Sequence, residues 1–379
     1  MEQDDAEIIY SIALTKIIPF NAADALRIYV TLGNATAVYE NRTCIGDVIE
    51  DCSPRLVGML SDWDEPLRQA EKEMAFIRKY DISAIPFCSE RYPQRLKECV
   101  DAPVIVFYKG TTELNCLHAV SVVGTRKSTV YSDDLLHNFF IDMKALCPDV
   151  LVVSGLAYGV DVTAHKEALD NGMDTVAVLA HGLDTIYPSV HRDIANRMVR
   201  QGGLLTEYTS GTTAEKMNFV RRNRIIAGLT DATVVVESAG KGGALITAGI
   251  AGSYGRDVFA FPGDVTRPYS QGCNNLIRDN KAALITSADD FVKAMRWEGY
   301  AALREAKKKG VEVSLFPSLD EEEQKIVKTL EEINDLQINT IVVRTGIPVG
   351  KLSAKLLTLE MKGVTRSLAG GVYHLISRK

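Results

Sequence analysis

An apolar strand, a glycine-bearing turn and a helix follow one another from residue 150 onward, in the stretch Val150-Leu151-Val152-Val153-Ser154-Gly155-Leu156-Ala157-Tyr158-Gly159-Val160-Asp161. The apolar run is short and rich in valine, which favours a buried β-strand. Its two glycines let the backbone turn, and the segment after them has the apolar spacing of a helix. This unit indicates an α/β fold.

The same unit recurs between about residues 84 and 298. Short apolar strands that alternate with helices predict a doubly wound parallel sheet covered on both faces. Right-handed connections then place every loop from a strand to a helix at one edge of the sheet, where ligands bind. We expect strands at 104–108, 119–123, 150–153, 175–179, 203–206, 233–236 and 258–261, and helices at 132–146, 160–171, 190–200, 217–228 and 244–254.

A helical domain is expected to precede this core, over residues 1–83. Its first apolar stripe is Ile8, Ile9, Ile12 and Ala13, and further helical spacing covers 22–32 and 65–80. A small helical bundle and a helix-hairpin-helix contact to DNA are both open. The second is disfavoured because Pro19-Phe20-Asn21 replaces the usual glycine turn.

A linker and a small C-terminal domain are expected after the core. Residues 299–318 are the linker, and residues 319–379 have the outline of a winged helix. Its helices are expected at 319–332, 338–345 and 349–361, and its hairpin at 368–376. The helix in the recognition position is only weakly basic, so duplex DNA and protein both remain open as partners; its cationic residues are Lys351, Lys355 and Lys362.

The composition is that of a globular protein and does not by itself indicate a polyanion ligand. The chain has 379 residues, 46% of them hydrophobic, and a formal net charge of −6. A site for nucleic acid must therefore be a local patch of positive charge, or a set of backbone amides, on an acidic body.

The cysteines and the first residues indicate the compartment. Seven scattered cysteines without a C-x-x-C pair fit reduced thiols and argue against a disulfide framework or a structural zinc. The acidic first residues do not resemble a signal peptide, and no apolar run reaches the ~20 residues that span a bilayer. We expect a cytoplasmic protein with no metal site and no membrane partner.

Two glycine-bearing loops offer groups that bind anions. The first is Gly124-Thr125-Arg126-Lys127-Ser128, and the second contains Gly155 and Gly159. A glycine turn before a helix presents unpaired N–H groups to an anion, although glycine also serves simply to turn the chain. The spacing is not G-x-G-x-x-G, so we expect no dinucleotide cofactor. In the second unit we expect Asp161 to cap the helix and His165 to be a hydrogen-bonded structural residue.

The densest basic segment has Lys216, Arg221, Arg222 and Arg224 within nine residues, with Phe219 among them and no acid. Such a segment suits single-stranded nucleic acid, because cations follow the phosphates while an aromatic ring stacks on a base. A solvated basic helix is the alternative. Helical spacing puts Arg222 on a different face from Arg221 and Arg224, so we expect at least one arginine to pair with a carboxylate inside the protein.

Three further glycine-bearing loops lie at 237–247, 261–264 and 271–277. Together with the first two, they are expected to form an anion-binding surface of backbone amides at the sheet edge. From all these loops we expect the contacts to DNA to be made by Gly124, Thr125, Arg126, Lys127, Ser154, Gly155, Gly159, Lys216, Phe219, Arg221, Arg222, Asn223, Arg224, Gly242, Gly243 and Asn274.

These motifs form an ordered set that covers roughly residues 84–295. In order they are YPQRLK, DAP, GTRKS, SGLAYGVD, KMNFVRRNRIIAGL, ESAGKGGALITA, FPGD and GCNNLI. The set resembles the signature of the DNA-processing protein A (DprA/Smf) family. The resemblance implies an extended Rossmann-like fold that binds single-stranded DNA through Arg126, Lys216 and Phe219. It also implies a homodimer that protects incoming DNA and loads the RecA recombinase during natural transformation.

Two other functions stay open. Related Rossmann-like proteins hydrolyse nucleotides with a glutamate that follows a glycine-rich loop, whereas the loop at 240–247 has no glutamate after it. Glu237, Asp161 and Glu207 remain candidate acids, and we expect none of them to be catalytic. The third possibility is a DNA-binding regulator, whose core senses a nucleotide while its winged helix reads duplex DNA.

Overall fold

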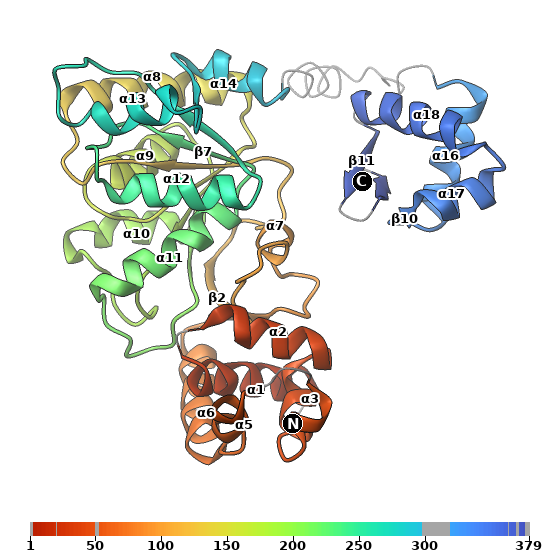
Figure 1. The fold of residues 1–379 in the computed structure, drawn as a ribbon. Helices are drawn as coiled ribbons and strands as arrows, with labels where there is room; N and C mark the ends of the chain where they lie inside the picture. The colour runs from red at the N-terminus through yellow and green to blue at the C-terminus, as the bar shows by residue number, and fades with distance from the viewer. Residues whose placement is uncertain are drawn as a thin grey trace. The chain divides into compact units, whose positions relative to one another are not determined.

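The computed structural model describes residues 3–19, 21–49, 53–297, 319–362, 364–368 and 371–375 (Figure 1). The chain divides into two compact units, Met1–Glu298 and Gly299–Lys379. The expected linker at 299–318 lies outside the described residues. Within the described residues, no helix combines the length and the apolar character that a membrane span requires.

The first unit is built on a nine-stranded sheet with the order β1-β2-β6-β5-β4-β3-β7-β8-β9. Strands β3 to β9 pair in parallel, which confirms the doubly wound sheet, and β1 and β2 extend it with two antiparallel pairings beside β6. The strands are β1 (Ser83–Pro86), β2 (Ile105–Gly110), β3 (Ala119–Val123), β4 (Leu151–Ser154), β5 (Thr175–Val178), β6 (Gly202–Thr206), β7 (Ala232–Val235), β8 (Asp257–Ala260) and β9 (Ala283–Leu284).

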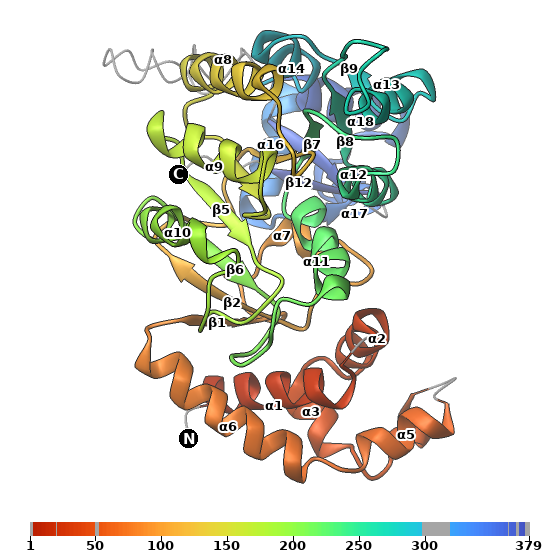
Figure 2. The ribbon, with the colours of Figure 1, turned by 90° about the vertical axis from the view of Figure 1, so that its left-hand side faces the viewer.

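Two helical layers cover this sheet (Figure 2). One consists of α8 (Val130–Leu146), α9 (Val160–Asp170), α10 (Arg192–Met198) and α14 (Ala288–Ala294). The other consists of α7 (Gln94–Lys97), α11 (Lys216–Gly228), α12 (Gly243–Ser253) and α13 (Gln271–Arg278). All seven predicted strands and five predicted helices are confirmed to within two residues, with the short 3-10 turn Ser189–His191 leading into α10. Strands β1 and β9 were not predicted.

Strand β3 shows why both faces need a cover. Successive side chains of a strand point to opposite faces, so Val120 and Val122 pack beneath α8 and α9, while Ala119 and Val123 pack beneath α11 and α12. All five residues of β3 are buried. The continuous apolar run in the sequence thus corresponds to a central strand.

The N-terminal helices form a bundle that packs on the extended edge of the sheet. They are α1 (Gln3–Ile17), α2 (Ala22–Leu32), α3 (Ala35–Glu40), α4 (Ile45–Val48), α5 (Pro54–Leu60) and α6 (Asp64–Lys79). Of the predicted stripe, Ile12 and Ala13 are fully buried, and Ile8 and Ile9 are partly buried against the same apolar cluster. The same apolar cluster includes Ile105 and Phe107 of β2, so the bundle and the sheet share a core.

The second unit is a winged helix, as predicted. It contains α16 (Glu321–Glu332), β10 (Leu336–Gln337), α17 (Ile338–Thr345), α18 (Val349–Met361), β11 (Thr365–Leu368) and β12 (Val372–Leu375). The predicted hairpin began too late, at 368, because β11 already starts at Thr365.

The recognition-position helix α18 has little positive charge to offer a duplex. Lys351 pairs with Glu322 at 2.6 Å and Lys362 with Glu323 at 2.7 Å. Lys355 pairs with Asp320. All three predicted cationic residues therefore contact acids at the start of α16.

Candidate nucleic-acid interface

A pocket of about 490 Å³ opens at the carboxyl edge of the parallel strands, next to β3. The strand order reverses here, because β4 lies on one side of β3 and β7 on the other. Open α/β sheets bind their ligands at such a point. The predicted contact residues that line this pocket are Gly124, Thr125, Arg126, Lys216, Phe219, Arg222, Asn223, Gly242 and Gly243.

The pocket carries an excess of positive charge. Among the described residues that line it, three side chains are cationic, Arg126, Lys216 and Arg222, and one is a carboxylate, Asp161. Concave sites with one sign of charge concentrate oppositely charged ligands even on a protein whose net charge is negative. The local patch required by the acidic composition is thus present.

Arg126 is held in place by the first glycine loop. The N–H of Thr125 donates to the carbonyl of Glu237 at 2.7 Å, and the carbonyl of Thr125 accepts from the N–H of Val160 at 3.1 Å. These two bonds join the loop that carries Arg126 to the residues after β7 and to the start of α9. The exposed Arg126 side chain reaches over Phe219, with its Cζ 5.0 Å from the ring centroid, which is within cation–π distance.

Phe219 is half-buried and does not belong to any of the apolar clusters of the described residues. Its neighbours are two guanidinium groups, those of Arg126 and Arg222, and the ring of Tyr187 at 5.8 Å. Lys216 is exposed at the first residue of the same helix. The ring and the two exposed cations therefore meet in one pocket.

The glycines of the second loop serve close contact between loops. Gly159 has φ +74°, and a Cβ there would lie 2.3 Å from the carbonyl oxygen of Thr125. A Cβ at Gly155 would lie 2.5 Å from Nη2 of Arg222. Ser154 is fully buried and donates to the carbonyl of Val122 at 2.6 Å. None of Ser154, Gly155 and Gly159 lines the pocket, so the direct contact expected from the sequence is replaced by a supporting role.

Arg222 is a structural residue beneath the pocket. Its side chain is 3% exposed and donates to the carbonyl of Gly155 at 2.8 Å and to that of Val178. Burial lowers the pKa of Arg222 to about 10, while the nearby Asp161 opposes this shift. Burial raises the pKa of Asp161 in turn, against the charge of Arg222. Because Nη1 is engaged by two carbonyl groups and the residue is almost fully buried, the structure favours a supporting role for Arg222 over the predicted contact with DNA.

Arg224 also points away from the pocket. Its Nη2 lies 2.5 Å from the carboxylate of Glu207, and its Nε lies 3.9 Å from Asp101. This confirms that at least one arginine of the basic segment pairs with a carboxylate inside the protein. Burial raises the pKa of Glu207, although Arg224 opposes the shift. The predicted DNA contact of Arg224 is therefore corrected to a structural ion pair.

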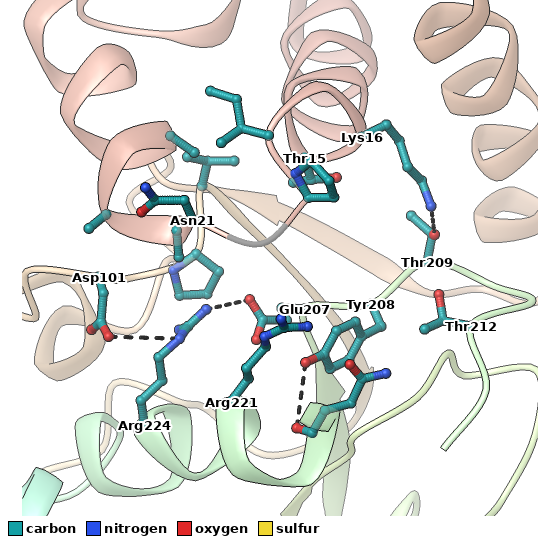
Figure 3. A pocket seen from close by; sticks show the side chains of 18 of the residues that line it. Thr15, Lys16, Asn21, Asp101, Glu207, Tyr208, Thr209, Thr212, Arg221 and Arg224 are labelled. Carbon is teal, nitrogen blue, oxygen red and sulfur yellow. Dashed lines mark hydrogen bonds and ion pairs between the residues drawn. The ribbon is translucent and has the colours of Figure 1, made fainter. Parts of the chain in front are cut away.

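A second cavity, of about 550 Å³, lies on the other side of α11, between this helix and the ends of α1 and α2 (Figure 3). Arg221 lines this cavity and not the first one. Among its described lining residues, three cationic side chains stand against three carboxylates, namely Lys16, Arg221 and Arg224 against Asp101, Glu207 and Glu215. Without an excess of charge, this cavity does not favour a polyanion.

The fourth loop places a helix N-terminus at the pocket. Helix α12 begins at Gly243, and a Cβ added there would meet no atom within 4 Å. The first N–H groups of a helix lack partners within the helix and attract anions. Asn274, in contrast, uses its amide to bind both the N–H and the carbonyl of Gly263, at 3.1 and 2.9 Å. Residues 271–277, expected as a loop, form helix α13, and Asn274 ties this helix to the loop after β8. Asn274 does not line the pocket, so its predicted contact with DNA is not supported.

The candidate acids and His165 have structural partners. Glu237 accepts from the hydroxyl of Thr129 at 3.0 Å and thereby holds the start of α8. Asp161 lies in the first turn of α9, whose cap is Gly159, so the predicted cap is wrong. His165 is fully buried, with Nδ1 2.7 Å from the hydroxyl of Thr175, as predicted for a structural histidine. No group of three or more metal-ligating side chains occurs in the described part of the chain.

Tyr187, which sequence reasoning did not select, also lines the pocket. It lies in the loop between β5 and α10, at the same edge as the glycine loops. The signal was present in the sequence, since an aromatic residue follows a predicted strand in a loop of this edge. It was missed because that loop has no glycine pair and no cluster of basic residues near Tyr187.

Two family models match the chain. The model described as DNA recombination-mediator protein A matches residues 83–296, and the DprA winged helix domain matches residues 315–371. Protein Smf of Escherichia coli (strain K12) is 34% identical over 327 residues, which cover 82% of this chain and 84% of that protein. DNA processing protein DprA of Streptococcus pneumoniae is 40% identical over 201 residues, covering 53% of this chain and 70% of that protein.

Two solved structures resemble the fold. The X-ray structure of DNA processing protein A from Streptococcus pneumoniae has a TM-score of 0.64 and 32% identity, covering 76% of this chain and 97% of that one. A structure of DNA processing protein A from Helicobacter pylori, which describes the unique single-stranded DNA binding mode of that protein, has a TM-score of 0.51 and 26% identity. It covers 56% of this chain and 95% of that one.

Proposed function

Because this chain belongs to the DNA recombination-mediator protein A (DprA/Smf) family, we propose that it binds single-stranded DNA in the pocket between β3 and α11. The observation that carries the proposal is the meeting of the exposed cations Arg126 and Lys216 with the ring of Phe219 in one positively charged pocket. Cations that follow the backbone and a ring that stacks on a base are the two parts of a single-strand site.

The contact that we propose for each pocket residue follows from the exposure of its side chain. Arg126 and Lys216 contact phosphates, and Phe219 takes a base. Lys127, which is exposed next to Arg126 but does not line the pocket, is proposed as an additional phosphate contact. The hydroxyl of Thr125, the amide of Asn223 and the backbone around Gly124, Gly242 and Gly243 offer hydrogen bonds to the strand. Ser154, Gly155, Gly159, Arg221, Arg222, Arg224 and Asn274 are set aside as direct contacts, since they do not line the pocket or are engaged inside the protein.

The cellular role rests on family membership. We propose that the protein acts as a homodimer in the cytoplasm, protects incoming single-stranded DNA and loads the RecA recombinase during natural transformation. The six described cysteines are unpaired, which suits a reducing compartment. The paired lysines of α18 argue against a main role in reading duplex DNA.

We also propose that the protein is a binding protein and not an enzyme. The carboxylates considered as catalytic acids have internal tasks: Glu237 holds the start of α8, Glu207 pairs with Arg224, and Asp161 neighbours Arg222. A hydrolase needs an acid or base that is free to exchange a proton with its substrate. No observation in the described residues favours nucleotide hydrolysis over binding.

The test is a titration of labelled oligo-dT with wild type, Arg126→Ala and Lys216→Ala at several salt concentrations. Each lost phosphate contact should weaken binding and reduce the slope of log affinity against log salt by about 0.7. Lys72→Ala, which removes an exposed lysine of α6 away from the pocket, is the matched control and should bind normally. If both pocket variants bind like wild type at every salt concentration, the assigned site is wrong.

A further inference from the structure

Tyr187 is an exposed aromatic residue in the pocket that the proposed phosphate and base contacts do not use. Its side chain is 49% exposed and lines the pocket beside Phe219. We propose that Tyr187 forms a second nucleobase subsite, which stacks the base adjacent to the one on Phe219. This inference rests on the proposed function, because it needs a single strand in this pocket.

The geometry of the two rings suits neighbouring bases of a single strand. Their centroids are 5.8 Å apart and their planes differ by 59°. The rings are in contact, so a base does not fit between them, and each ring must take a separate base. Because the ring planes differ by 59°, bases stacked face to face on the two rings do not lie parallel to each other. Two bases held on these rings are therefore pulled out of their mutual stack, which a duplex resists.

A buried histidine fixes the backbone of Tyr187. His181 is 1% exposed, and its Nε2 accepts from the N–H of Tyr187 at 3.2 Å. Its Nδ1 lies 2.8 Å from the carbonyl of Gly182, so one neutral ring spans both ends of the loop. The carbonyl of His181 accepts from the hydroxyl of Thr206 at 2.9 Å, which anchors this loop to β6. A ring on a fixed backbone loses less conformational freedom when a base binds.

A purely structural role for Tyr187 is the competing explanation, since its ring contacts Phe219 and can act as its support. Tyr158 provides a matched comparison. It is also 49% exposed, it lies in the loop after β4 at the same sheet edge, and its ring packs against His191 at 5.1 Å. It does not line the pocket. Removal of Tyr158 thus controls for the loss of an exposed tyrosine at this edge.

The experiment measures the affinity of the full-length protein for labelled oligo-dT by fluorescence anisotropy. Tyr187→Leu, which keeps apolar volume and removes the ring, should weaken binding by about 5- to 140-fold, the range for one stacked base. Tyr187→Phe and Tyr158→Leu should bind like wild type. The salt slope of Tyr187→Leu should stay unchanged, because a stacking contact releases no counterion. Normal binding by Tyr187→Leu would overturn the proposal.

The double variant Tyr187→Leu/Phe219→Ala separates a subsite from a support. Two bases on two rings predict that the double variant binds more weakly than either single variant, while the contact between the rings makes the two fold-losses depart from strict multiplication. If the double variant binds no more weakly than Phe219→Ala alone, Tyr187 only supports Phe219 and the proposal fails. Should Arg126→Ala and Phe219→Ala both bind normally, the proposed function itself is wrong, and this outcome is distinct from a defect confined to Tyr187.

Discussion

Phe219→Ala separates a base-stacking ring from a core residue. Phe219 is half-buried and lies outside the apolar clusters, so the variant should not incur the full cost of about 3–5 kcal/mol for a buried phenylalanine. Loss of a stacked base should instead cost about 1–3 kcal/mol of binding free energy. This corresponds to a roughly 5- to 140-fold increase in Kd for oligo-dT.

The assay pairs thermal melting with an anisotropy titration, for wild type and variant in the same buffer. Phe140→Ala is the matched control, because Phe140 lies fully buried on the inner face of α8 and does not line the pocket. This control should lose about 3–5 kcal/mol of stability. Its folded fraction should still bind DNA normally. A large drop in Tm for Phe219→Ala, with unchanged affinity below the transition, would show that Phe219 is a core residue and not a base contact.

Three further predictions concern buried groups. Arg224→Ala should lower the free energy of unfolding by about 3–5 kcal/mol in urea titrations, because it leaves Glu207 buried without its partner; a stable variant that has lost DNA affinity would contradict this. Wild type should release no phosphate from nucleotides, and Glu237→Gln should only lose stability; turnover that disappears in the variant would indicate an enzyme. Burial lowers the pKa of His165 to about 3. The stability that neutral His165 provides is therefore fully present above the unfolded-state pKa of about 6.5. Below that pH the free energy of unfolding falls by about 1.4 kcal/mol per pH unit, because the unfolded chain binds a proton that the folded protein does not. Urea titrations at pH 7 and 5.5 should show a shallower decline for His165→Gln than for wild type, and equal declines would refute the assignment.

The central sheet could be predicted from the sequence because its strands are apolar on both faces. Val120 and Val122 face one helical layer and Val123 the other, so the run reads as continuously hydrophobic. Strand β9 escaped prediction because its two residues, Ala283 and Leu284, are both exposed at the sheet edge. A short exposed strand carries no burial pattern that a reader of the sequence can detect.

The pocket could be predicted as a set of loops, but not residue by residue. Arg222 and Arg224 look alike in the sequence, and both turned out to be engaged inside the protein. The partners of Arg222 come from the loop after β4 and from β5, and the partner of Arg224 comes from the loop after β6. Helical periodicity gives the direction of a side chain but not what another element places opposite it. The position of Arg126 at the pocket could be predicted because it follows strand β3 directly, at the carboxyl edge of the sheet.

The proposed single-strand preference is tested most directly by titrating the wild-type protein with labelled oligo-dT and with a duplex of equal length, at low and high salt. We expect tighter binding of the single strand at both salt concentrations. We also expect the slope of log affinity against log salt concentration to be about −1.4 or steeper, from the two phosphate contacts of Arg126 and Lys216. Equal or tighter binding of the duplex would contradict the proposed single-strand preference and favour a regulator that reads double-stranded DNA.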